Sequence, residues 1–233
     1  MKDSLMIESG WRPRFYFSHY HIQAAALFSS LSARLEQQYE GNDSVPYEVI
    51  AEHRAYVIGC ILSAASFLEA GVNEIFADAT DDKREHIHQM GEDAILLMAN
   101  LRKLGVAKTA SYQVLQKYQI ALVLAKKQQF DKGAAPYQDV ELLIMLRNAL
   151  VHFDPETTSQ AGASSVNIEK RLKGKFTLNP MTGRKTPFFP ERCMSAGCAK
   201  WAVESSVKFA DDFCSRLGLT PIFEGIRSSL ILE

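Results

Sequence analysis

The feature that most constrains the fold is one long apolar helical segment, residues 47–78. Apolar residues recur in it at steps of three and four, which is the spacing of one face of an α-helix. They are Val57, Ile61, Ala65, Leu68, Val72 and Ile75. The segment has no charged residue between Arg54 and Glu69. We therefore expect a central buried helix, rather than a membrane span, around which the other helices pack.

The same periodicity predicts five further long helices. They cover about residues 19–39, 84–104, 111–128, 137–153 and 193–216. Alternation typical of a strand is confined to a short stretch, residues 175–178. The sequence thus predicts an all-α fold, an antiparallel helical bundle that forms a single domain over residues 1–233, with its core at about 47–155.

One long connection, residues 154–192, interrupts this pattern before the last long helix. Its many prolines and glycines exclude one regular element, although a short helix near 165–173 fits inside. The connection is basic, and its possible RNA-binding residues are Lys170, Arg171, Lys173, Lys175, Arg184 and Lys185. Interleaved aromatic residues, Phe176, Phe188 and Phe189, would suit a flap that contacts phosphates and stacks on bases. The alternative is an ordinary solvated loop.

Charge and cysteine content limit the classes of partner. The net charge is −1, so the molecule as a whole does not attract nucleic acid or anionic membranes, and RNA binding would need a local patch. The beginning of the chain has no signal-peptide pattern. The four cysteines lack the spacing of zinc sites, and they are Cys60, Cys193, Cys198 and Cys214. We expect reduced, mostly buried thiols in a cytoplasmic protein that has no membrane partner.

The candidate functional site is the run from Arg147 to His152 near the end of the predicted helix 137–153. Pro155 disfavours helical geometry at Asp154, which places His152 in the last turn. Free carbonyls at a helix C-terminus stabilise a protonated imidazole there. A histidine can take the proton of a ribose 2′-hydroxyl or protonate a leaving oxygen, while an arginine fork holds the phosphate. Asn148 would orient either group.

The phase of the helix complicates this site. Arg147 and His152 are five residues apart, so they are about 140° apart around an ideal helix axis and about 7.5 Å apart along it. Three arrangements remain open: the arginine wraps around the helix, the last turn distorts, or a second copy of the chain completes the site. The third arrangement predicts a homodimer with paired helices.

The spacing alone is not specific, because Arg14 and His19 have the same separation without an asparagine or an apolar helix before them. An alternative for the site is an arginine that packs at the helix flank and a histidine that satisfies the helix C-terminus.

With its context, the run LRNALVHFDP at residues 146–155 resembles the motif of the HEPN superfamily (higher eukaryotes and prokaryotes nucleotide-binding domains). That motif is an arginine, a polar residue and a histidine near the end of a late bundle helix. SAASFLEAGVNEIF at residues 63–76 is similar to the central helix of many members. The resemblance covers about residues 47–155 and implies a helical bundle that dimerises with its motifs facing each other. Many members are metal-independent RNases of toxin–antitoxin or phage-defence systems, whereas others are inactive and bind partners.

By this resemblance Arg147 and His152 would be catalytic, with Asn148 in support. Glu69 and Asn73, one turn apart in the central helix, would orient the arginine, or else form a polar network or an exposed helix edge. Glu74 is expected to face solvent. No metal and no cofactor is required by this set of residues.

The sequence therefore predicts a metal-independent endoribonuclease that acts on RNA as a homodimer, with an antitoxin protein as a possible partner. The alternatives are a catalytically inactive helical module that binds a nucleotide, RNA or a protein, and a bundle whose surface serves only dimerisation.

Overall fold

The computed structural model describes residues 15–42, 44–81, 84, 86–105, 113–153, 163–183 and 185–230, without the side chains of 163–166. Every regular element in this part of the chain is helical. The elements are α1 (Ser18–Tyr39), α2 (Tyr47–Asp78), α3 (Glu92–Lys103), α4 (Val114–Leu124), α5 (Tyr137–Val151), α6 (Ala163–Leu172), η1 (Phe188–Arg192), α7 (Ala196–Leu217) and η2 (Glu224–Leu230). The all-α prediction is confirmed, and the short strand expected at 175–178 is absent from the described residues.

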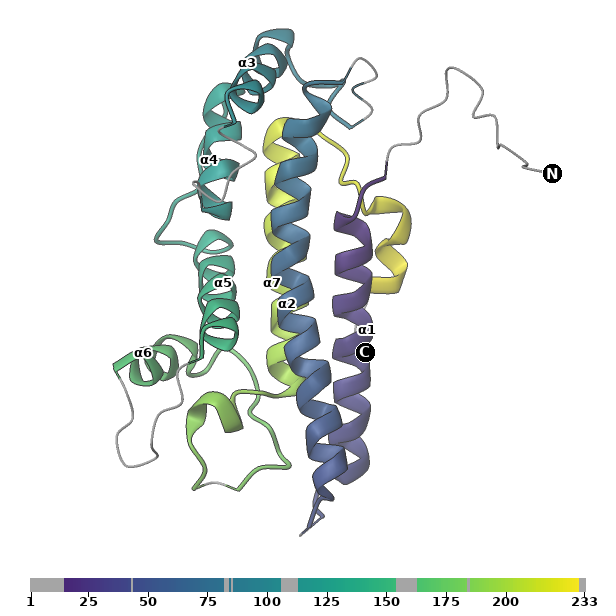
Figure 1. The fold of residues 1–233 in the computed structure, drawn as a ribbon, viewed down its shortest axis with the longest axis vertical. Helices are drawn as coiled ribbons and strands as arrows, with labels where there is room; N and C mark the ends of the chain where they lie inside the picture. The colour runs from purple at the N-terminus through teal and green to yellow at the C-terminus, as the bar shows by residue number, and fades with distance from the viewer. Residues whose placement is uncertain are drawn as a thin grey trace, which may run out of the picture.

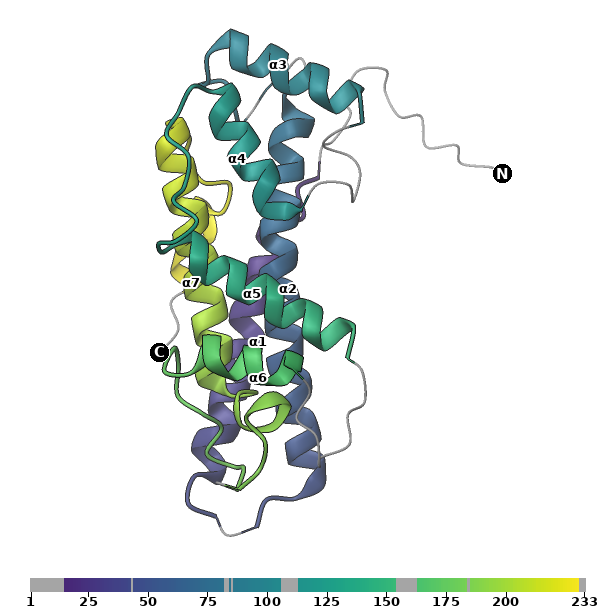
Figure 2. The ribbon, with the colours of Figure 1, turned by 90° about the vertical axis from the view of Figure 1, so that its left-hand side faces the viewer.

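Three long helices, α1, α2 and α7, lie side by side along the long axis of the molecule (Figure 1). α1 runs antiparallel to the other two, and α2 and α7 run in the same direction because the chain returns through α3 to α6 between them. Those four shorter helices lie along one side of the α2–α7 pair, and α5 crosses that pair at a slant (Figure 2). The chain between α2 and α7 therefore forms a second layer on a three-helix core.

α2 occupies the centre that its sequence predicts. Val57, Ile61, Leu68 and Val72 have no exposed surface, and Ile75 is partly buried against the same core. α2 is also long and apolar enough to cross a membrane, a property that core helices of globular proteins share. Here its apolar stripe packs against α1, α5 and α7.

The third helix is shorter than predicted. Periodicity placed its start near residue 84, but α3 begins at Glu92, after Gly91 in an extended conformation. Residues 86–90 form turns instead, with Arg84 at a φ of 49°. Ile87 and Met90, whose spacing suggested a helix face, are nevertheless buried. Their spacing therefore predicted burial correctly, but these two side chains are buried by turns and not by a helix.

The short helix expected near 165–173 is present as α6, and the connection also contains η1 and returns tightly to the start of α7. A Cβ atom on Gly197 would lie 2.6 Å from the carbonyl oxygen of Thr177. Ser195 caps α7 by accepting from the Cys198 N–H, and its hydroxyl donates to the same Thr177 carbonyl at 2.6 Å. Glycine at 197 therefore permits a backbone contact that fixes the end of the connection on α7.

The N-terminus of α1 is held by a carboxylate of α2. Glu74 accepts through Oε1 from the backbone N–H groups of Phe17 and Ser18, at 2.7 and 2.9 Å. A carboxylate at a helix N-terminus satisfies free N–H groups and stabilises the positive end of the helix dipole. The expectation that Glu74 faces solvent is wrong, because this contact comes from a residue 57 positions away in the sequence.

A second carboxylate, Glu36 of α1, joins all three long helices. Its Oε1 lies 2.9 Å from Nε2 of His53 in α2 and accepts from the backbone N–H of Ala196, the first residue of α7, at 2.7 Å. His53 is 1% exposed. The Glu36 carboxylate thus satisfies a buried ring nitrogen and a free helix-end N–H at the same time.

Replacement of Glu36 by alanine should lower the free energy of unfolding by about 2–3 kcal/mol, because two buried donors lose their acceptor. Equilibrium unfolding in urea measures this. Glu204→Ala on the exposed face of α7 is the matched control and should change the free energy by less than about 0.5 kcal/mol. Equal effects of the two substitutions would contradict the role given to Glu36.

Candidate functional site

α5 crosses α2 at a slant (Figure 2). Residues of these two helices, of the start of α4 and of α6 line a groove of about 720 Å³. Arg147, Asn148 and His152 all line it. The other wall residues come from α2, α4 and α6 and include Glu69, Gln113 and Asn167. The structure therefore brings the three motif residues to one groove.

α5 is held in place by its apolar face. Val140, Leu143 and Leu146, at steps of three, have no exposed surface and pack toward the α2–α7 pair. The next residues, Arg147 and Asn148, lie on the side of the helix that opens to the groove. Burial of the leucines thus sets the rotation of the helix, and that rotation presents the motif.

Arg147 and Asn148 contact each other directly. The guanidinium donates from Nη1 to Oδ1 of Asn148 at 3.0 Å. Among the described residues no carboxylate pairs with Arg147, so its remaining N–H groups are available to an anion in the groove. Asn148 therefore has the orienting position that the sequence predicts for it.

His152 lies just beyond the last helical residue, Val151. Its backbone N–H still donates to the Asn148 carbonyl at 2.9 Å, but its dihedral angles, φ −110° and ψ 42°, are no longer helical. The side chain is exposed and faces the same groove as Arg147. The geometry of an ideal helix, on which the phase conflict rests, does not hold at this residue, so both ends of the motif reach one groove.

The two predicted supporting residues are separated. Glu69 is exposed and lines the groove. Asn73 lies one turn further on and accepts from Nζ of Lys117 at 3.0 Å, while its backbone carbonyl accepts from Arg102 at 3.4 Å. Lys117 is 4% exposed. Asn73 thus belongs to a polar network between α2, α3 and α4, and Glu69 alone is placed near the motif.

Part of the basic connection is bound to α5 by ion pairs. Arg171 donates to Glu141 at 2.7 Å and contacts the Met145 sulfur at 3.4 Å, and Lys175 donates to Asp139 at 2.7 Å. Lys170, Lys173 and Lys185 are exposed, and Arg184 lies outside the described residues. Two of the expected RNA-binding cations are therefore engaged with carboxylates of the motif helix.

The expected base-stacking role of the aromatic residues in this connection is wrong. Phe188 and Phe189 are each 7% exposed, and Phe176 packs against Trp201 with ring centroids 5.5 Å apart. Cations alternate with aromatic residues here because the segment buries its rings against α7 and the end of α5. The ring centroids of Phe189 and Phe153 are 6.1 Å apart. Rings in the core cannot stack on bases.

All four cysteines are buried free thiols. Burial raises the pKa of the Cys193 and Cys214 thiols to about 12, and it also raises the pKa of the Cys60 and Cys198 thiols. Within the described part of the chain, no three His, Cys, Asp or Glu side chains are grouped as a metal site would require.

The thiols should therefore resist alkylation in the native protein. Their raised pKa values keep them protonated at pH 8, and the thiolate is the reactive form. Iodoacetamide at pH 8 followed by mass spectrometry should show little labelling of the native protein and four labels in urea. Rapid labelling of any cysteine under native conditions would show that its surroundings open, contrary to the packing described above.

Comparison with known proteins gives no match: no family model, no curated protein and no solved structure is significantly similar to this chain. The resemblance to the HEPN motif accordingly depends on the sequence pattern alone and stays a prediction.

Proposed function

We propose that the protein is a metal-independent endoribonuclease of the HEPN type. The observation that supports this most is that Arg147, Asn148 and His152 line one groove, with the arginine oriented by the asparagine. A cationic fork and an imidazole at one surface are the groups that cleavage of an RNA phosphodiester needs when no metal takes part. Reduced, buried thiols suit the cytoplasm, where such a substrate occurs.

The reaction would be a transfer of the phosphoryl group within the RNA. The ribose 2′-oxygen attacks the phosphorus, its proton passes to His152, and the bond to the 5′-oxygen breaks. The products are a 2′,3′-cyclic phosphate and a 5′-hydroxyl. Arg147 would hold the non-bridging oxygens and stabilise their developing charge.

This reaction needs a second proton carrier, because the leaving 5′-oxygen must be protonated. Each chain supplies one motif histidine, so we propose that a homodimer brings the histidine of a second copy to the same phosphate. Exposed apolar side chains flank His152 on both sides: Val151 is 49% exposed and Phe153 48%. Burial of such residues favours association, so the surface around the motif is suited to a partner copy.

A second candidate function is a catalytically inactive module that binds RNA, a nucleotide or a protein such as an antitoxin in the same groove. One observation favours it: among the described residues no side chain hydrogen-bonds to the imidazole of His152. Catalytic bases are usually oriented by a third group. Binding requires no such orientation.

The His152→Ala variant should lose RNA cleavage by about 10²-fold or more, since a positioned general acid or base contributes about that factor. Purified protein is incubated with end-labelled RNAs in EDTA, and the 2′,3′-cyclic ends are detected chemically. The control is His19→Ala, because His19 has the same separation from an arginine in the sequence. Urea unfolding confirms that both variants are folded.

Failure of the wild-type protein to cut varied RNAs would exclude the nuclease. In that case, RNA binding that is weakened by Arg147→Ala but tolerates Glu204→Ala would support the inactive module.

The shared site makes a separate prediction about mixed dimers. Wild-type chains that exchange subunits with an excess of His152→Ala chains should lose most of their cleavage activity, because each mixed dimer brings only one histidine to the shared phosphate. Phe153→Glu should give a monomer in sedimentation velocity and lose cleavage, whereas Leu97→Glu, 46% exposed on α3, should do neither. An active wild-type monomer would contradict the shared site.

A further inference from the structure

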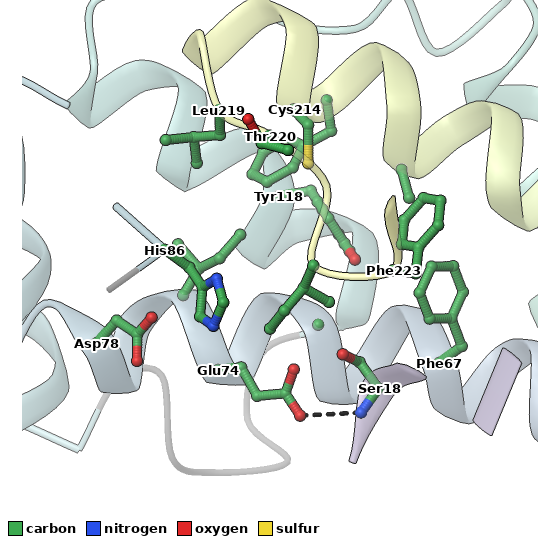
Figure 3. Close-up of a pocket in the computed structure, with 15 residues that line it drawn as sticks. Ser18, Phe67, Glu74, Asp78, His86, Tyr118, Cys214, Leu219, Thr220 and Phe223 are labelled. Atoms are coloured by element: carbon green, nitrogen blue, oxygen red, sulfur yellow. Dashed lines mark hydrogen bonds between the residues drawn. The ribbon is translucent and has the colours of Figure 1, made fainter. Parts of the chain in front are cut away.

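A small cavity lies at the C-terminal half of α2, next to the start of α1 (Figure 3). Its lining residues differ from those of the groove that holds the motif. It has a volume of about 50 Å³ and is bounded by the first turn of α1, the last turns of α2, Tyr118 of α4 and the segment after α7. A site for one water needs about 10–15 Å³, so this space holds about three or four atoms of that size. Exposed Thr220 is among the lining residues, which places the cavity next to the surface.

Two buried polar atoms line this cavity without a partner among the described residues. The first is the hydroxyl of Ser18, whose residue has no exposed surface. The second is Oε2 of Glu74, the oxygen that the α1 cap leaves unused. Figure 3 shows the Glu74 carboxylate projecting from α2 to the Ser18 backbone. Buried polar groups are nearly always hydrogen-bonded, so this pair indicates a bound group that donates hydrogen bonds.

The charge of the lining favours a hydrogen-bond donor that is a cation. Glu74 and Asp78 line the cavity with His86 beside them, and Asp78 is 1% exposed with Oδ1 accepting from Tyr16. The described lining residues include no lysine or arginine. A cation would offset this negative charge in a place from which water is largely excluded. The described carboxylates do not form the group of three ligands that a metal ion would require, and Oε1 of Glu74 is already occupied by two N–H groups.

One side of the wall is aromatic. Phe67 and Phe223 meet edge to face at 5.3 Å, and Tyr118 and Phe213 complete this side. The hydroxyl of Tyr118 donates to the Leu68 carbonyl at 2.8 Å, so its ring rather than its O–H hydrogen is available to a ligand. Aromatic rings attract compact cations and accept short alkyl groups.

We infer that this cavity binds a primary alkylammonium ion, whose N–H groups donate to Glu74 Oε2 and Ser18 Oγ and whose carbon atoms contact the aromatic wall. The volume admits a free amine of two or three carbons, or the amino end of a longer diamine that passes the surface at Thr220. Both sources present the same ammonium group to the same two oxygens.

Isothermal titration calorimetry with ethylammonium chloride tests this, in buffer whose ionic strength is held constant with sodium chloride. Saturable binding with one site is expected, together with a rise in melting temperature that increases with ligand concentration. Tetramethylammonium, which has no N–H group, and ethanol, which has no charge, should not bind. 1,4-Diaminobutane should compete with ethylammonium if the end of a longer amine also enters.

Two variants locate the site. Ser18→Ala removes one partner, and Glu74→Gln keeps an oxygen for the α1 cap while replacing the other acceptor with an amide. Each should weaken ethylammonium binding by about tenfold or more, as expected for a lost hydrogen bond to a charged group. Glu204→Gln on the exposed face of α7 should bind as the wild type does.

The inference is overturned if ethylammonium does not bind, or if ethanol or tetramethylammonium binds equally well. It is also overturned if Ser18→Ala, whose folding is checked by urea unfolding, binds ethylammonium with wild-type affinity. Water would then be the occupant of the cavity.

Discussion

The arrangement of the three long helices depends on the carboxylate of Glu36. It accepts from the α7 backbone at Ala196 and pairs with the buried ring of His53, so it joins the end of α1 to the beginnings of α2 and α7. From this junction α2 and α7 run in the same direction (Figure 1). A parallel pair requires a long return of the chain, and α3 to α6 make that return on one side of the pair. The groove exists because of this second layer.

The position of the candidate site follows from the burial of α5 rather than from the motif itself. The buried Leu143 and Leu146 fix the rotation of α5 about its axis. Because the helix ends at Val151, His152 adopts dihedral angles that are not helical. Periodicity, which predicts α2 to its bounds and α5 to within two residues, is reliable for such faces because burial sets them. The contact of Asn148 with Arg147 is likewise local, because the two residues are adjacent in the chain.

The features that the sequence did not disclose are contacts between distant residues. Glu36 meets Ala196 across 160 positions and Glu74 meets Phe17 across 57, and no local pattern indicates either pairing. The aromatic rings of the basic connection show the opposite case, in which a local pattern suggested contacts with bases although the rings are buried. Phe188 and Phe189 alternate with cations as in a nucleic-acid-binding loop, yet that composition also suits a strap that buries its aromatic side and keeps its charges in water. Composition alone does not distinguish these two arrangements.

The polar residues of the otherwise apolar α2 mark the places where this helix makes specific polar contacts. Glu69 and Asn73 share one face of the helix, whereas Glu74 and Asp78 share another, about 140° away. The first face meets the groove and Lys117, and the second meets the start of α1 and Tyr16. A polar group in a core helix is costly unless it is bonded, so each of these residues marks a place where the helix contacts something other than apolar packing. Glu69 differs from the other three because it is exposed and none of the described residues bonds to its carboxylate, and it lines the same groove as Arg147. A carboxylate and a guanidinium that face one groove without binding each other are suited to a ligand that offers both a donor and an anion, and a nucleotide, with its base and its phosphate, is such a ligand.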